Sequence, residues 1–374
     1  MSRLFEETEM NGMTMKNRLV RSATWEGMCE PDGQPTRKLA ECYADLARGG
    51  VGLIISSYTF IRPDGKGLPG QMGIHTDAFA DAMKSLTVAV HGHGGKICMQ
   101  LVHAGGQTSV KTIGSQPLAP SAVALLQFPE VPAELLHEDI AELVALFGAG
   151  AARAREYGFD AVQLHASHGY LINQFLSPLT NRRSDIYGGS AENRCRFLME
   201  VYRSIRGAVG DDFPVLVKLN GADNLEGGLE LADALQAARA LDREGIDAIE
   251  VSAGTPASGD YGPIRQGIAT RAQEAYNLPL AAAIKNNVGC PIMVVGGVRS
   301  IEVAEDIIDR EDADYVSLSR PFIREPHLAL RWQGGNRERA TCISCNGCFK
   351  PGLKEGGIYC VVDKIERENR GVSV

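Results

Sequence analysis

Eight short apolar runs, each separated from the next by a longer stretch, constrain the fold of this chain more than any other feature. They lie at residues 19–24, 51–56, 96–101, 160–165, 214–219, 247–252, 291–296 and 314–319. Helical patterns such as those at 36–50, 137–158 and 231–245 stand between them and end in Gly, as helix C-caps do. Nearly continuous apolar strands separated by helices predict a parallel sheet with a covered outer face. Eight such units predict an α/β fold of the (β/α)8 TIM barrel type.

An open, doubly wound sheet is the alternative fold. Such a sheet usually has fewer strands, and no G-x-G-x-x-G motif follows the first apolar run. We therefore expect a barrel over residues 1–335, followed by a short cysteine-rich C-terminal extension over residues 336–374.

The composition excludes several classes of protein. The formal net charge of −8, without a Lys/Arg cluster, argues against a nucleic-acid partner. No apolar run approaches the roughly 20 residues that a membrane helix needs. The first twenty residues lack the charged-then-apolar order of a signal peptide. These features predict a cytoplasmic protein.

Polar side chains gather where the predicted strands end, which in a barrel is the usual position of the active site. The residues in question are Ala23, Thr24, Trp25, Gln100, His103, His165, His168, Tyr170 and Lys218. Lys218 is either an exposed lysine with its stem along the surface or a buried cation. A buried lysine would need an anionic partner, which a reduced flavin or a substrate oxygen could supply.

The last two strands carry the features of a phosphate site. Gly296 and Gly297 would let the backbone approach a phosphate, and Ser319 and Arg320 offer donors for its oxygens. The alternative is that the two glycines only turn the chain and Arg320 lies at the surface.

The nine cysteines fall into two groups. Five are scattered and are expected to be free thiols, namely Cys29, Cys42, Cys98, Cys195 and Cys290. The other four form a C-x2-C-x2-C-x11-C cluster of Cys342, Cys345, Cys348 and Cys360. In a cytosolic chain this spacing indicates a metal or iron–sulfur site. A [4Fe–4S] cluster, tetrahedral zinc and four free thiols all remain open.

Several motifs together resemble the Old Yellow Enzyme family of FMN-dependent ene-reductases. They are NGMTMKNRLVRSA, QLVHAGG, HASHGYLINQFLSPLTNRRSDIYGGSAENRCRF, VGGVRS and SLSRPF, and they cover nearly the whole chain. The chain looks closest to the bacterial branch that includes the barrel part of 2,4-dienoyl-CoA reductase and 2-enoate reductases. The resemblance implies FMN as cofactor, NAD(P)H as reductant and a small unsaturated substrate.

The resemblance also implies roles for individual residues. Ala23, Thr24 and Tyr58 would lie along the flavin ring, and Gln100 would bond its pyrimidine edge. Lys218 stands where the family usually has Arg, near flavin N1 and the C2 carbonyl. Gly297, Ser319 and Arg320 would hold the FMN phosphate. Trp25 and Glu26 depart from the smaller side chains of relatives, and Trp25 is expected to narrow the substrate pocket.

The resemblance also implies that His165, His168 and Tyr170 act on the substrate. In the family, the pair matched by His165 and His168 bonds the carbonyl oxygen of an α,β-unsaturated substrate. Hydride would pass from flavin N5 to the β-carbon, and Tyr170 would protonate the α-carbon. The alternatives are a demethylase or dehydrogenase resembling trimethylamine dehydrogenase, a non-flavin barrel using His103, His165 and His168 as metal ligands, and a non-catalytic electron-transfer subunit.

Long relatives of this family carry a similar cysteine cluster. There a [4Fe–4S] centre relays electrons to FMN from a second flavin domain, which we expect to be absent here. The resemblance therefore implies either an electron-donor protein or direct reduction of FMN by NADH or NADPH. It also implies a dimer or a larger homo-oligomer.

Overall fold

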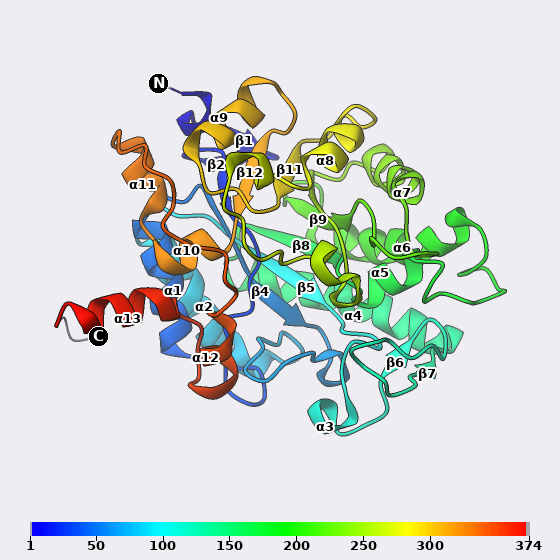
Figure 1. The fold of residues 1–374 in the computed structure, drawn as a ribbon. Helices are drawn as coiled ribbons and strands as arrows, with labels where there is room; N and C mark the ends of the chain where they lie inside the picture. Colours follow the sequence, from blue (N-terminus) through cyan, green and yellow to red (C-terminus); the bar gives the residue numbers. More distant parts are fainter. Residues whose placement is uncertain (1, 372–374) are drawn as a thin grey trace.

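The structure is a computed structural model that describes residues 2–371, and its centre is a closed eight-stranded barrel (Figure 1). Around the ring the strands run β10, β11, β12, β3, β4, β5, β8, β9, all parallel to their neighbours. They are β3 (Leu19–Arg21), β4 (Leu53–Phe60), β5 (Ile97–Val102), β8 (Ala161–Ala166), β9 (Val215–Asn220), β10 (Ala248–Ser252), β11 (Ile292–Val295) and β12 (Tyr315–Leu318). Each strand overlaps one predicted run, so the TIM barrel is confirmed and the open sheet is wrong.

Amphipathic helices cover the outside of the barrel. The main ones are α1 (Arg37–Arg48), α2 (Ala80–His91), α4 (His137–Glu156), α6 (Ala191–Val209), α7 (Leu231–Arg243), α8 (Leu278–Lys285) and α9 (Ile301–Asp309). In α1 the Thr36 side chain accepts from the Leu39 N–H, a typical N-cap. Leu39, Tyr43 and Leu46 recur at helical spacing and are buried against the strands. Among the described residues, no helix combines the length and apolar character needed to cross a membrane.

A hairpin closes the amino end of the barrel. Strands β1 (Thr8–Met10) and β2 (Met13–Met15) pair antiparallel around Asn11 and Gly12, both with positive φ. The methionines of this hairpin pack with side chains from the beginnings of the barrel strands. That cluster contains Met10, Met13, Met15, Val20, Leu53, Ile55, Cys98, Ala161, Leu216, Ala248, Met293 and Tyr315. The amino end is therefore a packed, apolar plug.

The C-terminal extension returns to the carboxyl end of the barrel, as the orange and red segments in Figure 1 show. It contains α12 (Phe349–Lys354) and α13 (Val361–Asn369), which follow α10 (Arg320–Arg324) and α11 (Leu328–Gln333). The Ile358 N–H donates to the Glu26 carbonyl at 2.9 Å, and the Lys38 ammonium donates to the Gly356 carbonyl at 3.0 Å. The extension thus packs on the segment that follows β3. The division into residues 1–335 and 336–374 remains a prediction, and residues 1 and 372–374 lie outside the described part.

Candidate active site

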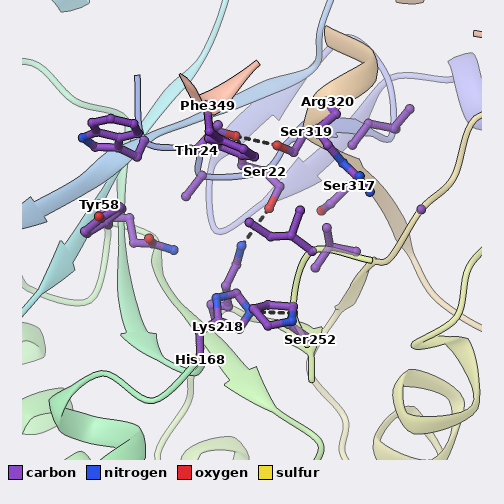
Figure 2. Close-up of a pocket in the computed structure, with 18 of the residues that line it drawn as sticks. Ser22, Thr24, Tyr58, His168, Lys218, Ser252, Ser317, Ser319, Arg320 and Phe349 are labelled. Carbon is purple, nitrogen blue, oxygen red and sulfur yellow. Dashed lines mark hydrogen bonds between the residues drawn. The ribbon is translucent and has the colours of Figure 1, made fainter. Parts of the chain in front are cut away.

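A cavity opens at the carboxyl end of the barrel, where the strand ends bring distant residues together (Figure 2). Most of the residues predicted from the sequence line it. These are Ala23, Thr24, Trp25, Tyr58, Gln100, His165, His168, Tyr170, Lys218, Gly297, Ser319 and Arg320. Since they come from seven strands or the loops that follow them, only the closed barrel brings them together.

Two predicted positions lie elsewhere. Gly296 does not line the cavity; its carbonyl accepts the Tyr276 N–H at 3.1 Å, so it fixes the loop before α8 instead. His103 is fully buried, and its Nε2 lies 3.4 Å from Asp64 Oδ1. Because His103 does not line the cavity, it cannot complete a metal triad with His165 and His168 there. The three-histidine alternative is therefore wrong in this fold, and a phosphate contact for Gly296 remains a prediction.

Four aromatic side chains meet on one wall of the cavity. His165 ends β8, and its ring centroid lies 5.2 Å from that of His168 and 4.6 Å from that of Tyr170. The Tyr58 ring lies next to that of Tyr170, with 5.3 Å between the two ring centroids. The turn that carries this wall has positive φ at His168 and Gly169. A Cβ on Gly169 would lie 2.6 Å from the Gln107 side-chain oxygen, so this turn requires glycine.

Hydrogen bonds orient both imidazoles. His168 Nε2 lies 2.7 Å from the Ser252 hydroxyl, and His165 Nδ1 lies 3.2 Å from the Ser167 hydroxyl. Burial lowers the pKa of both histidines well below its usual value, and the nearby Lys218 charge lowers each further. Burial also raises the pKa of Tyr170. At neutral pH the wall therefore consists of two neutral imidazoles and a protonated phenol.

Lys218 projects from β9 into the barrel and is only 2% exposed, so it is not a surface lysine. Its ammonium donates to the Ser22 hydroxyl at 2.7 Å, as Figure 2 shows. It also lies 3.2 Å from the Glu250 carboxylate. The sequence suggested a reduced flavin or a substrate oxygen as the anionic partner, whereas in the fold the chain itself supplies one. Burial lowers the pKa of Lys218, and the carboxylate of Glu250 opposes that shift.

The opposite end of the cavity is formed by the loops after β11 and β12. Gly297 has a φ of 76°, and a Cβ there would lie 2.8 Å from the Tyr276 ring. Ser319 precedes α10, with its hydroxyl 2.7 Å from that of Thr24. The Arg320 guanidinium donates to the Arg265 carbonyl at 2.8 Å and to Asn346 Oδ1 at 2.6 Å. Arg320 is 8% exposed, so the surface alternative for it is wrong.

The cavity presents polar atoms that suit a large ligand with hydrogen-bonding edges. Tyr58 Oη, Gln100 Oε1 and Ser317 Oγ are buried and have no hydrogen-bond partner within the described residues. A buried polar atom left unpaired is costly, so these atoms indicate sites where a ligand bonds. Together with the glycine at 297, they fit a flat heterocycle that carries a phosphate.

Sequence reasoning missed part of the lining. Ser22, Ser252 and Ser317 lie at or next to strand ends, so their positions were a usable signal. Phe349 and Leu353 belong to the C-terminal extension, and both line the same cavity. No local pattern could place them there. Trp25 packs against this extension, since a Cβ on Gly352 would lie 2.8 Å from the indole, whose N–H donates to the Pro69 carbonyl.

The four clustered cysteines line one small pocket beside the main cavity. Cys342, Cys345, Cys348 and Cys360 share it with Arg320, which also lines the main cavity. Burial raises the pKa of Cys348 to about 12, and the charge of Arg320 opposes this. Within residues 2–371, no three His, Cys, Asp or Glu side chains converge in a metal-binding arrangement. The sulfurs are thus neighbours, but they are not drawn together around one point.

Comparison with known proteins identifies the family. Residues 3–338 match the sequence profile of the NADH:flavin oxidoreductase / NADH oxidase family. The chain belongs to this family. It is 38% identical over 355 residues to the NADH oxidase of Thermoanaerobacter brockii, covering 92% of this chain and 53% of that protein. Membership makes the chain an FMN-dependent oxidoreductase of the Old Yellow Enzyme type.

Solved structures agree with this family. A 2-naphthoyl-CoA reductase in complex with 2-naphthoyl-CoA superposes with a TM-score of 0.90 at 28% identity, covering 96% of this chain and 56% of that one. The Old Yellow Enzyme homologue of Zymomonas mobilis gives a TM-score of 0.80 at 29% identity, covering 94% and 98%. The chain therefore spans about half the length of the NADH oxidase and the naphthoyl-CoA reductase, but nearly all of the Zymomonas protein.

Proposed function

We propose that this family member is an ene-reductase that reduces the C=C bond of α,β-unsaturated carbonyl or enoyl compounds. The observation that carries the proposal is the wall of two neutral imidazoles and one protonated phenol within a cavity that Lys218 and Gln100 also line. Bound FMN would supply the hydride for the β-carbon of the substrate. The donors suit a carbonyl oxygen better than a cationic amine, which favours ene reduction over amine demethylation.

The hydrogen bonds of the histidines define how each could donate. If the Ser252 hydroxyl donates to His168 Nε2, the remaining ring proton lies on Nδ1. If the Ser167 hydroxyl donates to His165 Nδ1, that imidazole keeps its proton on Nε2. Both rings then donate one N–H to the substrate oxygen as negative charge develops on it. The low pKa of each histidine keeps this oxyanion site neutral before substrate binds.

Tyr170 is the proposed proton donor to the α-carbon. Its pKa is raised by burial, so the phenol keeps its proton throughout the physiological pH range. Its ring lies beside His165, which would place the carbonyl oxygen and the α-carbon of one substrate within reach of the two groups. Trp25 borders the same cavity and is proposed to limit the size of the substrate.

The residues proposed to hold FMN lie along the rest of the cavity. Ala23, Thr24 and Tyr58 would contact the ring system, and Gln100 and Lys218 would bond its pyrimidine edge. Gly297, Ser319 and Arg320 would hold the phosphate. The support is that all of these residues line one cavity and that the oxygens of Tyr58 and Gln100 are unpaired there.

The cysteine pocket is proposed to bind an iron–sulfur cluster through Cys342, Cys345, Cys348 and Cys360, with zinc as the alternative. Four cysteines suit either. A cluster would supply single electrons, and its presence would favour an electron-donor protein over NADH or NADPH as the direct reductant. Anaerobic purification followed by iron, sulfide and zinc analysis distinguishes the two metals from free thiols.

A spectroscopic titration tests the ene-reductase proposal. Protein loaded with FMN should show twin flavin bands that bleach with NADH, NADPH or dithionite and return when 2-cyclohexen-1-one is added without oxygen. Return of the bands with oxygen, but with none of several enones and enals, would contradict the proposal. Bleaching by dithionite alone would leave the ene reduction intact and point to a protein electron donor.

A further inference from the structure

Glu250 is a buried carboxylate that does not line the cavity. It lies in β10, is 0% exposed, and its side chain points into the interior of the barrel among polar side chains of neighbouring strands. It accepts hydrogen bonds from the Ser22 hydroxyl at 2.7 Å and from Gln163 Nε2 at 2.9 Å. The ammonium of Lys218 lies 3.2 Å away. Ser22 and Lys218 line the cavity, and Gln163 is hydrogen-bonded to Gln100, which also lines it.

Two hydrogen-bonded paths lead from Glu250 to the cavity wall. The first runs through Lys218, which also bonds Ser22, and both of these residues line the cavity. The second runs through Gln163, whose side-chain oxygen accepts from Gln100 Nε2 at 2.6 Å. That bond leaves the Gln100 side-chain oxygen free at the cavity. One carboxylate therefore fixes both side chains proposed to bond the pyrimidine edge of FMN.

The charges around Lys218 explain why a carboxylate is needed there. Arg21 lies on β3 and pairs with Glu26, while His165 and His168 approach from the β8 side and are neutral. Cys98 on β5 lies near Glu250 and is a buried, neutral thiol. Glu250 is thus the one carboxylate within bonding distance of the Lys218 ammonium among the described residues. An ammonium buried without such a partner readily loses its proton.

We propose that Glu250 is a positioning residue that keeps Lys218 charged and, with Gln163, holds Lys218 and Gln100 in place for FMN. This inference rests on the proposed function, because it assumes that Lys218 and Gln100 face the flavin. Through these two residues Glu250 controls how much more tightly the protein binds reduced FMN than oxidised FMN. A fixed cation beside the pyrimidine edge favours the anionic reduced form, and a lysine that loses its proton does not.

The test uses FMN-loaded protein with Glu250→Gln, which keeps the shape of the side chain and removes its charge. The midpoint potential of the flavin is measured from pH 6 to 9, together with the Kd of oxidised FMN. Removing a carboxylate lowers the pKa of a neighbouring ammonium, so Lys218 should lose its proton within this range. Above the pH at which Lys218 loses its proton, the preference for reduced over oxidised FMN should fall about tenfold, which is about 30 mV for a two-electron couple. Wild-type protein should show no such step.

The matched control is Glu26→Gln. Glu26 is 1% exposed and pairs with Arg21, and neither of these residues lines the cavity. Because a guanidinium does not lose its proton, this variant should lower the melting temperature without adding a step to the potential. A step of equal size in Glu26→Gln would overturn the proposal, since any buried carboxylate would then produce it.

A double-mutant cycle shows whether Glu250 acts through the lysine. In a Lys218→Met background, Glu250→Gln should leave the pH profile of the potential unchanged. If Glu250→Gln changed the pH profile of the potential equally in the wild-type and in the Lys218→Met background, the proposal would be overturned. It would also be overturned if the Glu250→Gln protein bound FMN normally and showed the wild-type profile. Glu250→Asp keeps the charge and should keep the wild-type profile, so the cycle remains informative if Glu250→Gln folds poorly. Failure of wild-type protein to bind FMN would instead contradict the proposed function itself.

Discussion

The two ends of the barrel are built from the same eight strands, yet they differ in almost every physical property. At the amino end, the first residues of the strands and the β1–β2 hairpin form an apolar plug with four methionines. At the carboxyl end, strand residues include Arg21, Lys218 and Glu250, each at most 2% exposed. Each strand therefore contributes to stability at its amino end and to chemistry at its carboxyl end, rather than some strands serving one purpose and some the other. Substitutions at the two ends should therefore affect different measured properties of the protein.

The largest effect is expected from Tyr170→Phe, a change at the carboxyl end that removes only a hydroxyl. Loss of a general acid typically costs 10²–10⁴-fold in rate, or about 3–5 kcal/mol in the barrier. Reduction of the flavin should keep its rate, and reoxidation by an enone should slow. Stopped-flow measurement of the two half-reactions checks this. Unchanged reoxidation by several enones would remove Tyr170 from the mechanism.

Lys218→Met should reduce stability, because it leaves the Glu250 carboxylate buried without its cation. Breaking one partner of a buried ion pair typically costs about 3–5 kcal/mol. The double variant Lys218→Met/Glu250→Gln should recover most of this loss, because it buries no unpaired charge. Denaturant unfolding of the apoprotein measures both. If the double variant were the less stable of the two, the charge argument for the carboxyl end would be wrong.

Met15→Ala tests the amino end. Met15 is 1% exposed within the plug, and replacing a buried Met by Ala typically costs about 2–5 kcal/mol through lost burial and a residual cavity. The FMN potential and the enone kinetics should stay at wild-type values. Met15→Leu conserves volume and serves as the control, with a cost of less than about 1.5 kcal/mol. A shifted flavin potential in Met15→Ala would show that the two ends are coupled.

Acid should destabilise the carboxyl end through its histidines. Burial lowers the pKa of His165 and His168 in the folded state, so below about pH 6.5 the unfolded chain binds more protons and stability falls with pH. The loss approaches about 1.4 kcal/mol per histidine for each pH unit below that value. Unfolding at pH 7 and pH 5.5 measures it. The His165→Asn/His168→Asn variant should lose this part of the dependence, and an unchanged slope would contradict it.

The fold could be predicted from the sequence because the strands of a parallel barrel are buried on both faces. Each is therefore a continuous apolar run that local inspection detects. The positions of Gln100 and Lys218 followed from the same rule, as polar residues near the ends of such runs. A glycine pair does not reveal which of its two residues faces the cavity; in this fold it is Gly297.

Other features of the site depend on contacts that no local pattern encodes. Glu250 is surrounded by apolar residues in its strand, and only the closed barrel shows that Ser22 and Lys218 surround its carboxylate. Phe349 reaches the cavity from the C-terminal extension, about 330 residues after the first barrel strand, β3. The sequence indicated metal chemistry for the cysteines, but the route by which their segment reaches the cavity depends on the tertiary fold.

The pairing of β12 with β3 has a consequence for how the chain is made. Val316 lies opposite Leu19, so the ring closes only when the first and last barrel strands meet. At synthesis rates of about 5–20 residues per second, the β1–β2 methionines are made roughly 15–60 s before β12, the last of the strands that they pack against. During that interval an apolar hairpin and an open sheet edge emerge from the ribosome without their partners. The nascent chain should therefore depend on chaperones until β12 has left the ribosome.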